Sequence, residues 1–307
     1  MMSLVTERPD DVAGGANTRG SRKKARPWSS TLPLRTALPM LVPLGVALVL
    51  FVVYPLVRLL WDSVTTGNGP GNYADALASG AVRRAIGVTL LDSVLVMLLA
   101  VVGGTALAWA ARTSRHKWLK GLIWASVLLP FWMGVVVKNY AFALLLAREG
   151  PINSALLDLG LIRQPLELMY TPIAVVLGMT YTMLPYAFLA VFPSVGTVNL
   201  DLLNASRGMG ASQRGTFARV VLPLIRPGII AGAAIVFAMA IGFYVTPVLL
   251  GGAQTPFIAS VISDDIFRFF DYPRAAATSV ILLVIALATL AVAIKAVGLR
   301  AIRGGLG

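Results

Sequence analysis

The sequence predicts an all-α polytopic membrane protein with six transmembrane helices, and two observations carry this prediction. Hydrophobic residues make up 57% of the 307 residues and charged residues only 13%, whereas soluble domains hold about 45–50% and about 25%. The apolar residues also gather in runs long enough to cross a bilayer, which takes about 20 helical residues. Because no water reaches the backbone inside the hydrocarbon, each run must satisfy its own amides and is therefore expected to be helical.

The first apolar run lies at 38–60 and is expected to be a retained transmembrane helix. It is too long for the core of a signal peptide, and no small-residue cleavage site follows it. The polar, basic residues 1–34 before it suit a disordered tail. The remaining runs of the six-helix domain, 35–303, are predicted at 86–111, 122–146, 172–195, 227–250 and 276–297. Pro130 and Pro185 should kink the third and fourth helices.

The connecting segments fall into two sets that alternate along the chain. The tail, the 112–120 and 196–226 loops and the C-terminal end are basic, whereas the 63–84, 147–170 and 251–275 segments are mixed or acidic. Positively charged loops stay in the cytoplasm, so both termini are predicted to be cytoplasmic. Arg83 and Arg84, on the outer side, are the one departure. The net charge of +13 comes from such loops, and no nucleic-acid partner is expected.

Several chemistries are excluded by composition. The chain has no cysteine, and its only histidine, His116, lies in a basic loop, so no metal or catalytic site is predicted. It also lacks the Gly-x-x-x-x-Gly-Lys-Ser/Thr phosphate loop, so it is not expected to hydrolyse ATP or to hold a cofactor itself. A membrane-embedded enzyme would need clustered acids or histidines within the apolar runs, and the sequence shows none.

The 196–226 loop is too polar to enter the membrane and too patterned to be a linker. Its first part suits a short helix with one apolar stripe, made by Leu202, Leu203, Ala205, Ser206 and Met209. Gly210 permits a left-handed residue that ends this helix, and Ser212 is placed to cap a second one. Pro223 and Pro227 should fix a bend into the fifth membrane helix. Such a helix–turn–helix knob suits the transmission of movement between a soluble partner and the membrane helices.

The spacing in this loop resembles the EAA signature of ATP-binding-cassette importer permeases, Glu-Ala-Ala-x3-Gly-x9-Ile-x-Leu-Pro. Gly210, Leu222 and Pro223 match, whereas Asn204 for Glu and Ser206 for Ala are departures. In the family the Glu often makes a charged contact with the ATPase, and an asparagine cannot form an ion pair. The resemblance implies an ATPase-coupling loop whose motif residues are Asn204, Ala205, Ser206, Gly210, Ala211, Val220, Leu222 and Pro223.

The resemblance covers about 38 to 300 and is strongest to the spermidine/putrescine (PotB-like) branch, through the stretches 179–186, 244–252 and 270–276. It implies the type I ABC importer (MetI-like) permease fold in a bacterial inner membrane. The implied partners are a second permease in a heterodimer, two ATPases that bind the ATP, an extracytoplasmic solute-binding protein and membrane lipid. Branches that move ferric iron, thiamine, opines or sulfate stay open, as does a stand-alone secondary transporter or channel.

Two ionisable residues interrupt the apolar runs. Such groups are costly in a membrane and are functional candidates by default. Asp92 and Lys138 are expected either to form a structural ion pair or to leave Asp92 facing the pathway, where it attracts a cationic solute. Cation–π contact with an amine is a possible role of the aromatic residues near the pathway, and interfacial anchoring is the alternative. These aromatic residues are Trp132, Tyr140, Tyr181, Tyr186 and Tyr244.

Small residues recur along the fifth run, at Gly228, Gly232, Ala238 and Gly242. This spacing predicts close helix packing, with the partner permease as one candidate neighbour. In the segment before the sixth run, Asp264, Asp265 and Asp271 are expected either to contact the binding protein or to be solvated.

Overall fold

The computed structural model describes residues 34–304, without the side chains of 34–38, 40, 41, 253, 293, 294 and 296–304. The predicted tail at 1–34 lies outside the described residues apart from Leu34. The chain divides into two units, one ending at Tyr54 and one beginning at Pro55. The described residues hold five helices that are long and apolar enough to span a membrane, or six if one bent pair counts as a span.

The described part of the first unit is helical. Helix α1 (Leu34–Leu48) continues into a π turn, η1 (Val49–Val53), in which the N–H of Tyr54 bonds the carbonyl of Val49. Pro55 follows at once, and a proline crowds the carbonyl four residues before it, so the wider turn accommodates the ring. The predicted first helix is confirmed, because residues Val42–Thr65 form a candidate membrane span.

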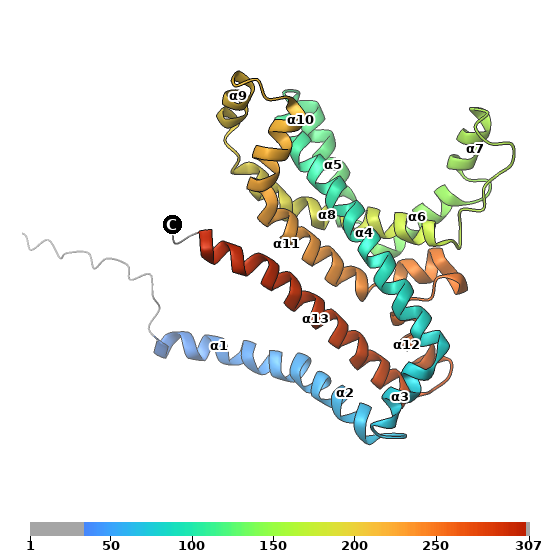
Figure 1. Cartoon of the computed structure of the whole chain (residues 1–307). Coiled ribbons are helices and arrows are strands. Elements are labelled where there is room, and N and C mark those ends of the chain that lie inside the picture. The colour runs from blue at the N-terminus through green and yellow to red at the C-terminus, as the bar shows by residue number, and fades with distance from the viewer. Residues whose placement is uncertain (1–33, 305–307) are drawn as a thin grey trace, which may run out of the picture. The chain divides into compact units, whose positions relative to one another are not determined.

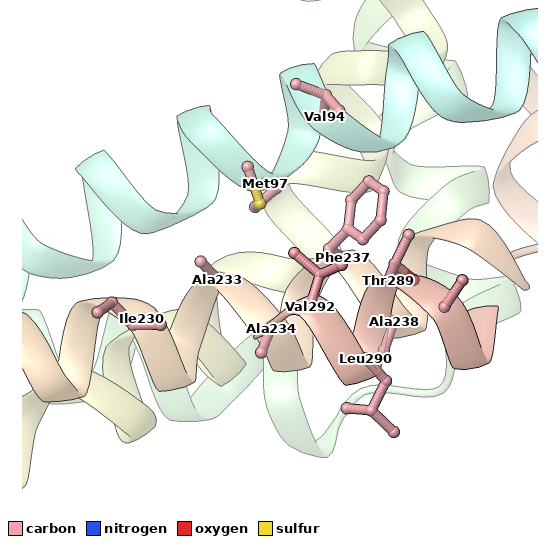
Figure 2. A pocket seen from close by; sticks show the side chains of 11 residues that line it. Val94, Met97, Ile230, Ala233, Ala234, Phe237, Ala238, Thr289, Leu290 and Val292 are labelled. Carbon is pink, nitrogen blue, oxygen red and sulfur yellow. The ribbon is translucent and has the colours of Figure 1, made fainter. Parts of the chain in front are cut away.

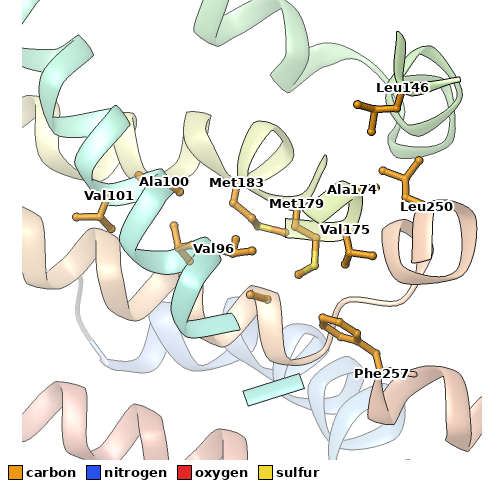
Figure 3. Packing of buried hydrophobic residues seen from close by; sticks show 13 residues of the cluster. Val96, Ala100, Val101, Leu146, Ala174, Val175, Met179, Met183, Leu250 and Phe257 are labelled. Carbon is orange, nitrogen blue, oxygen red and sulfur yellow. The ribbon is translucent and has the colours of Figure 1, made fainter. Parts of the chain in front are cut away.

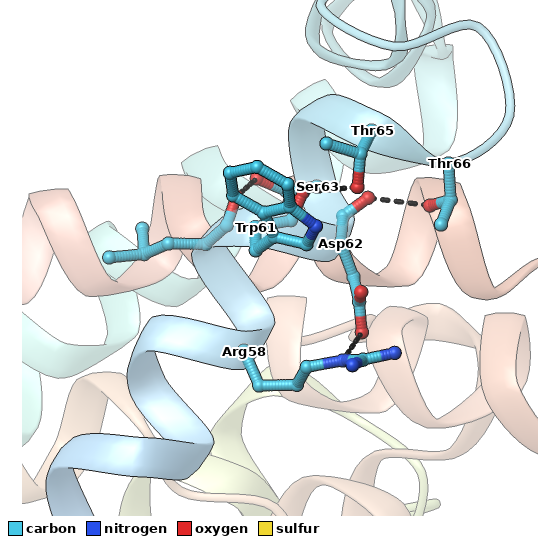
Figure 4. A network of polar contacts seen from close by, with 7 residues as sticks. Arg58, Trp61, Asp62, Ser63, Thr65 and Thr66 are labelled. Atoms are coloured by element: carbon cyan, nitrogen blue, oxygen red, sulfur yellow. Dashed lines mark hydrogen bonds and ion pairs between the residues drawn. The ribbon is translucent and has the colours of Figure 1, made fainter.

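Helix α2 (Tyr54–Thr65) ends in a set of side-chain bonds within the second unit (Figure 4). Arg58 pairs with Asp62 one turn later, and the hydroxyl of Thr66 donates to the carbonyl of Asp62. The Ser63 hydroxyl bonds the Tyr73 hydroxyl at 2.6 Å, which ties α2 to the short helix α3 (Gly71–Ala78). The last carbonyls of a helix lack backbone partners, which side chains or water must supply. Here the hydroxyls of Ser63, Thr65 and Thr66 donate hydrogen bonds to carbonyls of the last turns of α2.

Three long helices form the centre of the second unit: α4 (Gly80–Thr113), α8 (Pro172–Gly196) and α11 (Leu222–Ile241) (Figure 1). Helix α13 (Tyr272–Gly304) packs on α11. The core among α4, α8 and α11 is apolar and includes Val96, Met179, Met183 and Phe257 (Figure 3). The second, fourth and sixth predicted helices are therefore confirmed within a few residues at their starts.

Glycines determine how closely these helices approach one another. In a membrane, burying an apolar side chain against protein gains little over leaving it in lipid, so helices associate where small residues let their backbones come close. A Cβ at Gly228 would lie 3.2 Å from Cα of Val191 in α8, and Gly232 faces the same helix. The predicted close packing is confirmed, and it joins α11 to α8 of the same chain. Ala238 instead lines a surface groove, and Gly242 lies beyond the end of α11.

The predicted third helix, 122–146, is wrong as a single segment. The chain forms α5 (Lys117–Trp132) and α6 (Val135–Leu146), and the span bends by 114° between them. Pro130 lies inside α5, and the break follows at Met133 and Gly134, which have extended ψ angles of 137° and 142°. A proline removes one helical bond and weakens the turn around it, so the chain leaves the helix close to Pro130. Helix α8, by contrast, runs through Pro185 without a break.

The predicted fifth helix, 227–250, is shifted. One candidate span runs from Gln213 to Ile241 through α10 (Gln213–Thr216), the π turn η2 (Phe217–Val221) and α11, so Pro223 and Pro227 do not separate the loop helix from the membrane helix. As with η1, a single residue separates this π turn from a proline, because Leu222 follows η2 and Pro223 comes next. Beyond Ile241 the helix stops at Gly242, and Pro247–Gly251 forms a further π turn, η3.

Shorter helices complete the second unit. They are α7 (Pro151–Asp158), α9 (Leu200–Gly208), the 3-10 turn η4 (Gly252–Gln254) and α12 (Ile258–Phe267). Figure 1 shows α9 and α10 at one end of α11, and α3 and α12 toward the opposite ends of α4 and α13. The described fold is thus all-helical and polytopic, as the sequence predicts.

Candidate functional site

Helices α9 and α10, with the turn between them, form a small projection that we name the knob (residues 200–216). The amide of Ala211 bonds the carbonyl of Ser206, and the amide of Gly210 bonds the carbonyl of Arg207. With Gly210 at φ +83°, these two bonds make a Schellman end to α9. The Ser212 side chain then accepts from the amide of Gly215 and caps α10. The predicted turn and cap are both confirmed.

The interior of the knob is held by a polar bond and an aromatic contact. The hydroxyls of Ser206 and Thr216 lie 2.9 Å apart, and both residues are buried. Ser206, which departs from the motif's alanine, therefore joins α9 to α10. Below it the ring of Phe217 meets Trp109 of α4 edge to face, with 5.7 Å between the ring centroids. The first contact holds α9 to α10, and the second ties η2, which leads from the knob into α11, to α4.

The predicted apolar stripe of α9 is divided between two faces. Leu203 and Ser206 point inward, whereas Leu202 is 47% and Met209 is 84% exposed, and Ala205 is exposed between them. The predicted single apolar stripe is wrong, because the chain covers only one narrow side of this short helix. The outward face, Leu202, Ala205 and Met209, is a continuous apolar strip at i, i+3 and i+7, of the kind that marks interaction sites.

The other motif residues are arranged around the same region. Asn204, Gly210 and Ala211 are exposed on the knob, and Leu222 and Pro223 are exposed at the start of α11, whereas Val220 is half-buried. Most of the motif is therefore at the surface, where a partner can reach it.

Asp92 and Lys138 are buried in the second unit, each only 4% exposed. No ion pair joins them in the part of the chain that the structure describes, and Oδ2 of Asp92 has no hydrogen-bond partner there. Lys138 occupies the first turn of α6, directly after the break in the third span. The interior of the bundle thus contains an unpartnered carboxylate oxygen on α4.

The predicted pathway aromatics do not form one lining. Trp132, 83% exposed, lies at the end of α5 beside Phe131, which also contacts Tyr186 of α8. Tyr181 stacks on Phe142 of α6 at 5.7 Å between centroids. Tyr140 of α6 is exposed. Tyr244 lies apart, where its hydroxyl accepts a hydrogen bond from Ser263 of α12.

One polar contact that the sequence did not suggest joins the two interrupted segments. The hydroxyl of Thr246 donates to Oδ1 of Asn139 at 2.8 Å, and both residues are buried. Asn139 stands just after the break between α5 and α6, and Thr246 just after the break that ends α11. The only signal in the sequence is a lone Asn next to Lys138 in an otherwise apolar run.

A pocket of about 670 Å³ lies among the start of α4, η3, α12 and the start of α13. Asp265 lines it but is 1% exposed and forms an ion pair with Arg274, which also pairs with Asp271. The predicted solvation of Asp265 is therefore wrong, because the residue is buried and links α12 to α13, whereas its contact with a binding protein stays a prediction. Losing one member of such a buried pair leaves the other uncompensated.

An apolar groove of about 410 Å³ runs between α4, α11 and α13 (Figure 2). Val94 and Met97 border it from α4, and Phe237 and Ala238 from α11. Thr289 contributes the one side-chain hydroxyl, which is already bonded to carbonyls of its own helix. The groove offers no polar anchor and suits a hydrocarbon surrounding.

Comparison with known proteins gives consistent matches over most of the chain. Residues 34–303 match the family described as binding-protein-dependent transport system inner membrane component. The spermidine/putrescine transport system permease protein PotB of Escherichia coli (strain K12) is 31% identical over 258 residues, which cover 80% of this chain and 92% of that protein. The inner membrane ABC transporter permease protein YdcU of the same strain is 31% identical over 69% of this chain and 68% of its own length.

A solved structure has the same fold. In a bacterial alginate ABC transporter in complex with an alginate pentasaccharide-bound periplasmic protein, one chain matches with a TM-score of 0.72 and 19% identity. The match covers 85% of this chain and 94% of that one. At this identity the likeness concerns the arrangement of helices.

Proposed function

Because the chain belongs to the family of binding-protein-dependent transport system inner membrane components, and so is the permease component of an ABC importer, we propose that its solute is a polyamine such as putrescine or spermidine. The observation that carries the proposal is the 31% identity to a spermidine/putrescine permease over nearly all of that protein's length. The permease is not itself catalytic, so a separate ATPase must supply the energy.

The proposed assembly follows from the positions of the knob and the charged loops. The knob and both termini lie in the cytoplasm, as the basic residues of the 196–226 segment favour. Two ATPases dock on the knobs of this chain and of a second, different permease. A binding protein delivers solute to the opposite side, where α3 and α12 lie. The exposed strip of Leu202, Ala205 and Met209 supports the docking because it leaves apolar area without a neighbour in the second unit.

The pathway proposal centres on Asp92. An acid buried in the bundle, with an unpartnered oxygen and no ion pair among the described residues, suits transient contact with an ammonium group. Tyr181 and Tyr186, both on α8, are proposed to offer aromatic faces to the amine at separate points of the path. Lys138, Trp132 and Tyr244 are proposed to line other levels of the path.

Replacing Asp92 with asparagine is expected to lower putrescine uptake at least about tenfold, the effect of losing about 1.4 kcal/mol of attraction. Asparagine keeps the shape and removes a costly charge, so assembly should not suffer. Uptake and copurification of the ATPase are measured on the same preparations. Ser93→Ala is the matched control, since Ser93 is fully buried beside Asp92 and its hydroxyl also lacks a partner. Unchanged uptake by Asp92→Asn with intact assembly would remove the pathway role.

Reconstitution tests the proposed function directly. The permease pair, the ATPase and the cognate binding protein are placed in proteoliposomes, and labelled putrescine and spermidine are offered. We expect uptake that requires both ATP and the binding protein. Uptake by this chain alone without ATP would indicate a secondary transporter or channel. The solute is identified in a thermal shift screen of the cognate binding protein. If neither amine binds and iron, thiamine, an opine or sulfate does, that compound replaces the polyamine as the proposed solute.

A further inference from the structure

A pocket of about 360 Å³ lies among the knob, η2 and the end of α4. We name it the knob pocket. Trp109, Leu203 and Phe217 supply apolar lining, and Arg207 of α9 and Arg214 of α10 supply the charges. The remaining lining residues are Gln213, Thr216 and Val221. The bond between Ser206 and Thr216 holds α9 against α10 and so fixes the backbone positions of Arg207 and Arg214 relative to one another.

The charge of this pocket is unbalanced. Neither Arg207 nor Arg214 forms an ion pair within the described residues, and no acidic side chain lines the pocket. The 196–226 segment holds four arginines against one aspartate, Asp201, and the motif position that is often glutamate is the neutral Asn204. Two guanidinium groups beside an aromatic wall form a strong receptor for a carboxylate, because each offers a planar fork of donors.

We propose that the knob pocket receives an aspartate or glutamate side chain of the ATPase subunit, held between Arg207 and Arg214. The inference rests on the proposed function, since it requires an ATPase at the knob. It assigns the charge of that contact: the permease supplies the cations and the ATPase supplies the anion. The acid that Asn204 lacks is therefore expected on the partner.

A protein carboxylate fits the surroundings better than a lipid phosphate. The exposed strip of Leu202, Ala205 and Met209 lies on the same helix as Arg207, and Figure 1 shows α9 beyond the end of α11. Because Leu203 lines the pocket, the pocket and the strip lie on different sides of α9, and the strip supports a protein partner at the knob as a whole. Arginine and tryptophan, which both line this pocket, are also enriched among the residues that dominate the binding energy of protein interfaces.

The test is a charge reversal with rescue, made in the complete transporter. The double variant Arg207→Glu/Arg214→Glu should reduce ATPase copurification at least tenfold, together with solute-stimulated ATP hydrolysis. Reversing surface Asp and Glu residues of the ATPase one at a time to Arg should reveal one partner change that restores both readouts. Arg226→Glu is the control, because Arg226 lies in the same basic segment on α11 but does not line the pocket. It should retain the ATPase.

A second measurement covers the case in which the reversed variant does not fold. The chain has no cysteine, so Arg207→Cys introduces a unique thiol. Pairing it with single cysteines at acidic positions of the ATPase should give one strong disulfide cross-link.

Full ATPase retention by the double variant overturns the proposal, and so does cross-linking at basic ATPase positions only. A change that appears only when anionic lipid in the nanodisc is varied overturns it in favour of a phosphate headgroup. A solute other than a polyamine would change the proposed function but leave these readouts intact.

Discussion

Replacing Gly104 with leucine is expected to leave almost no folded permease in the membrane. A Cβ at this position would lie 2.8 Å from the backbone N of Phe188 and 3.0 Å from the carbonyl carbon of Ala187. Both are backbone atoms of α8, so no side chain can rotate out of the way. Overpacking of a core costs about 1–3 kcal/mol when side chains can adjust. The cost here should exceed that range, because α4 and α8 must separate at their contact.

The neighbouring glycine gives a matched control for this prediction. A Cβ at Gly103 would meet only Cδ1 of Leu184, at 3.3 Å, the movable end of a flexible side chain. Gly103→Leu and Gly104→Leu change helix propensity equally, so their difference reports on the α4–α8 contact. Size-exclusion profiles of tagged protein and thermal unfolding in detergent measure the yield and stability. Similar yields from the two variants would show that the contact does not control folding.

The sequence predicts the apolar helices and the local chemistry of the knob well. Four of the six predicted runs match described helices, because an uninterrupted apolar stretch must be helical in lipid. Gly210 and Ser212 were identifiable because each answers a local backbone requirement, a positive φ and an unsatisfied amide. Such requirements depend on a few neighbouring residues and are visible without the fold.

The breaks in the third and fifth runs were not predictable in the same way. Hydropathy is equally high on both sides of Gly134 and of Gly242. The mean hydropathy of a segment that contains either glycine therefore gives no sign of the break. What stabilises the broken form is tertiary: Asn139 and Thr246 satisfy one another across the two interrupted segments. The partner of Ser206 is equally nonlocal, since Thr216 comes from the next helix. A single sequence shows that these polar residues exist but not which of them meet.

The faces of α9 illustrate the same limit. The sequence places Leu202, Leu203 and Met209 on one short helix but does not say which of them is covered. In the structure, Phe217 and the end of α4 cover the side of Leu203, which leaves Leu202 and Met209 outside. The exposed strip of Leu202, Ala205 and Met209 is therefore a product of how the knob packs, and its loss should affect a partner more than the fold.

Replacing Met209 with aspartate is therefore expected to reduce ATP-driven uptake at least about tenfold, or about 1.4 kcal/mol of docking free energy. Met209 is 84% exposed, so the permease itself should fold normally. At the interface the carboxylate would be buried without a partner, and a buried unpaired charge is strongly unfavourable. Copurification of the ATPase and solute-stimulated ATP hydrolysis should fall together with uptake. The separate variant Met209→Leu should keep uptake, ATPase copurification and ATP hydrolysis near the levels of the unmodified protein, because leucine provides an apolar area of similar size.

Leu159→Asp separates docking from the local cost of the substitution. Leu159 is the C-cap residue of α7, as Met209 is of α9, and it is 72% exposed. An added negative charge at a helix C-terminus costs about 0.3–1 kcal/mol through the helix dipole, and both variants share this cost. Figure 1 shows α7 well apart from α9 and α10, so the Leu159 variant should retain the ATPase. Equal loss of ATPase by the two variants would assign the effect to the helix end. Loss confined to Met209→Asp would identify the strip as the docking face.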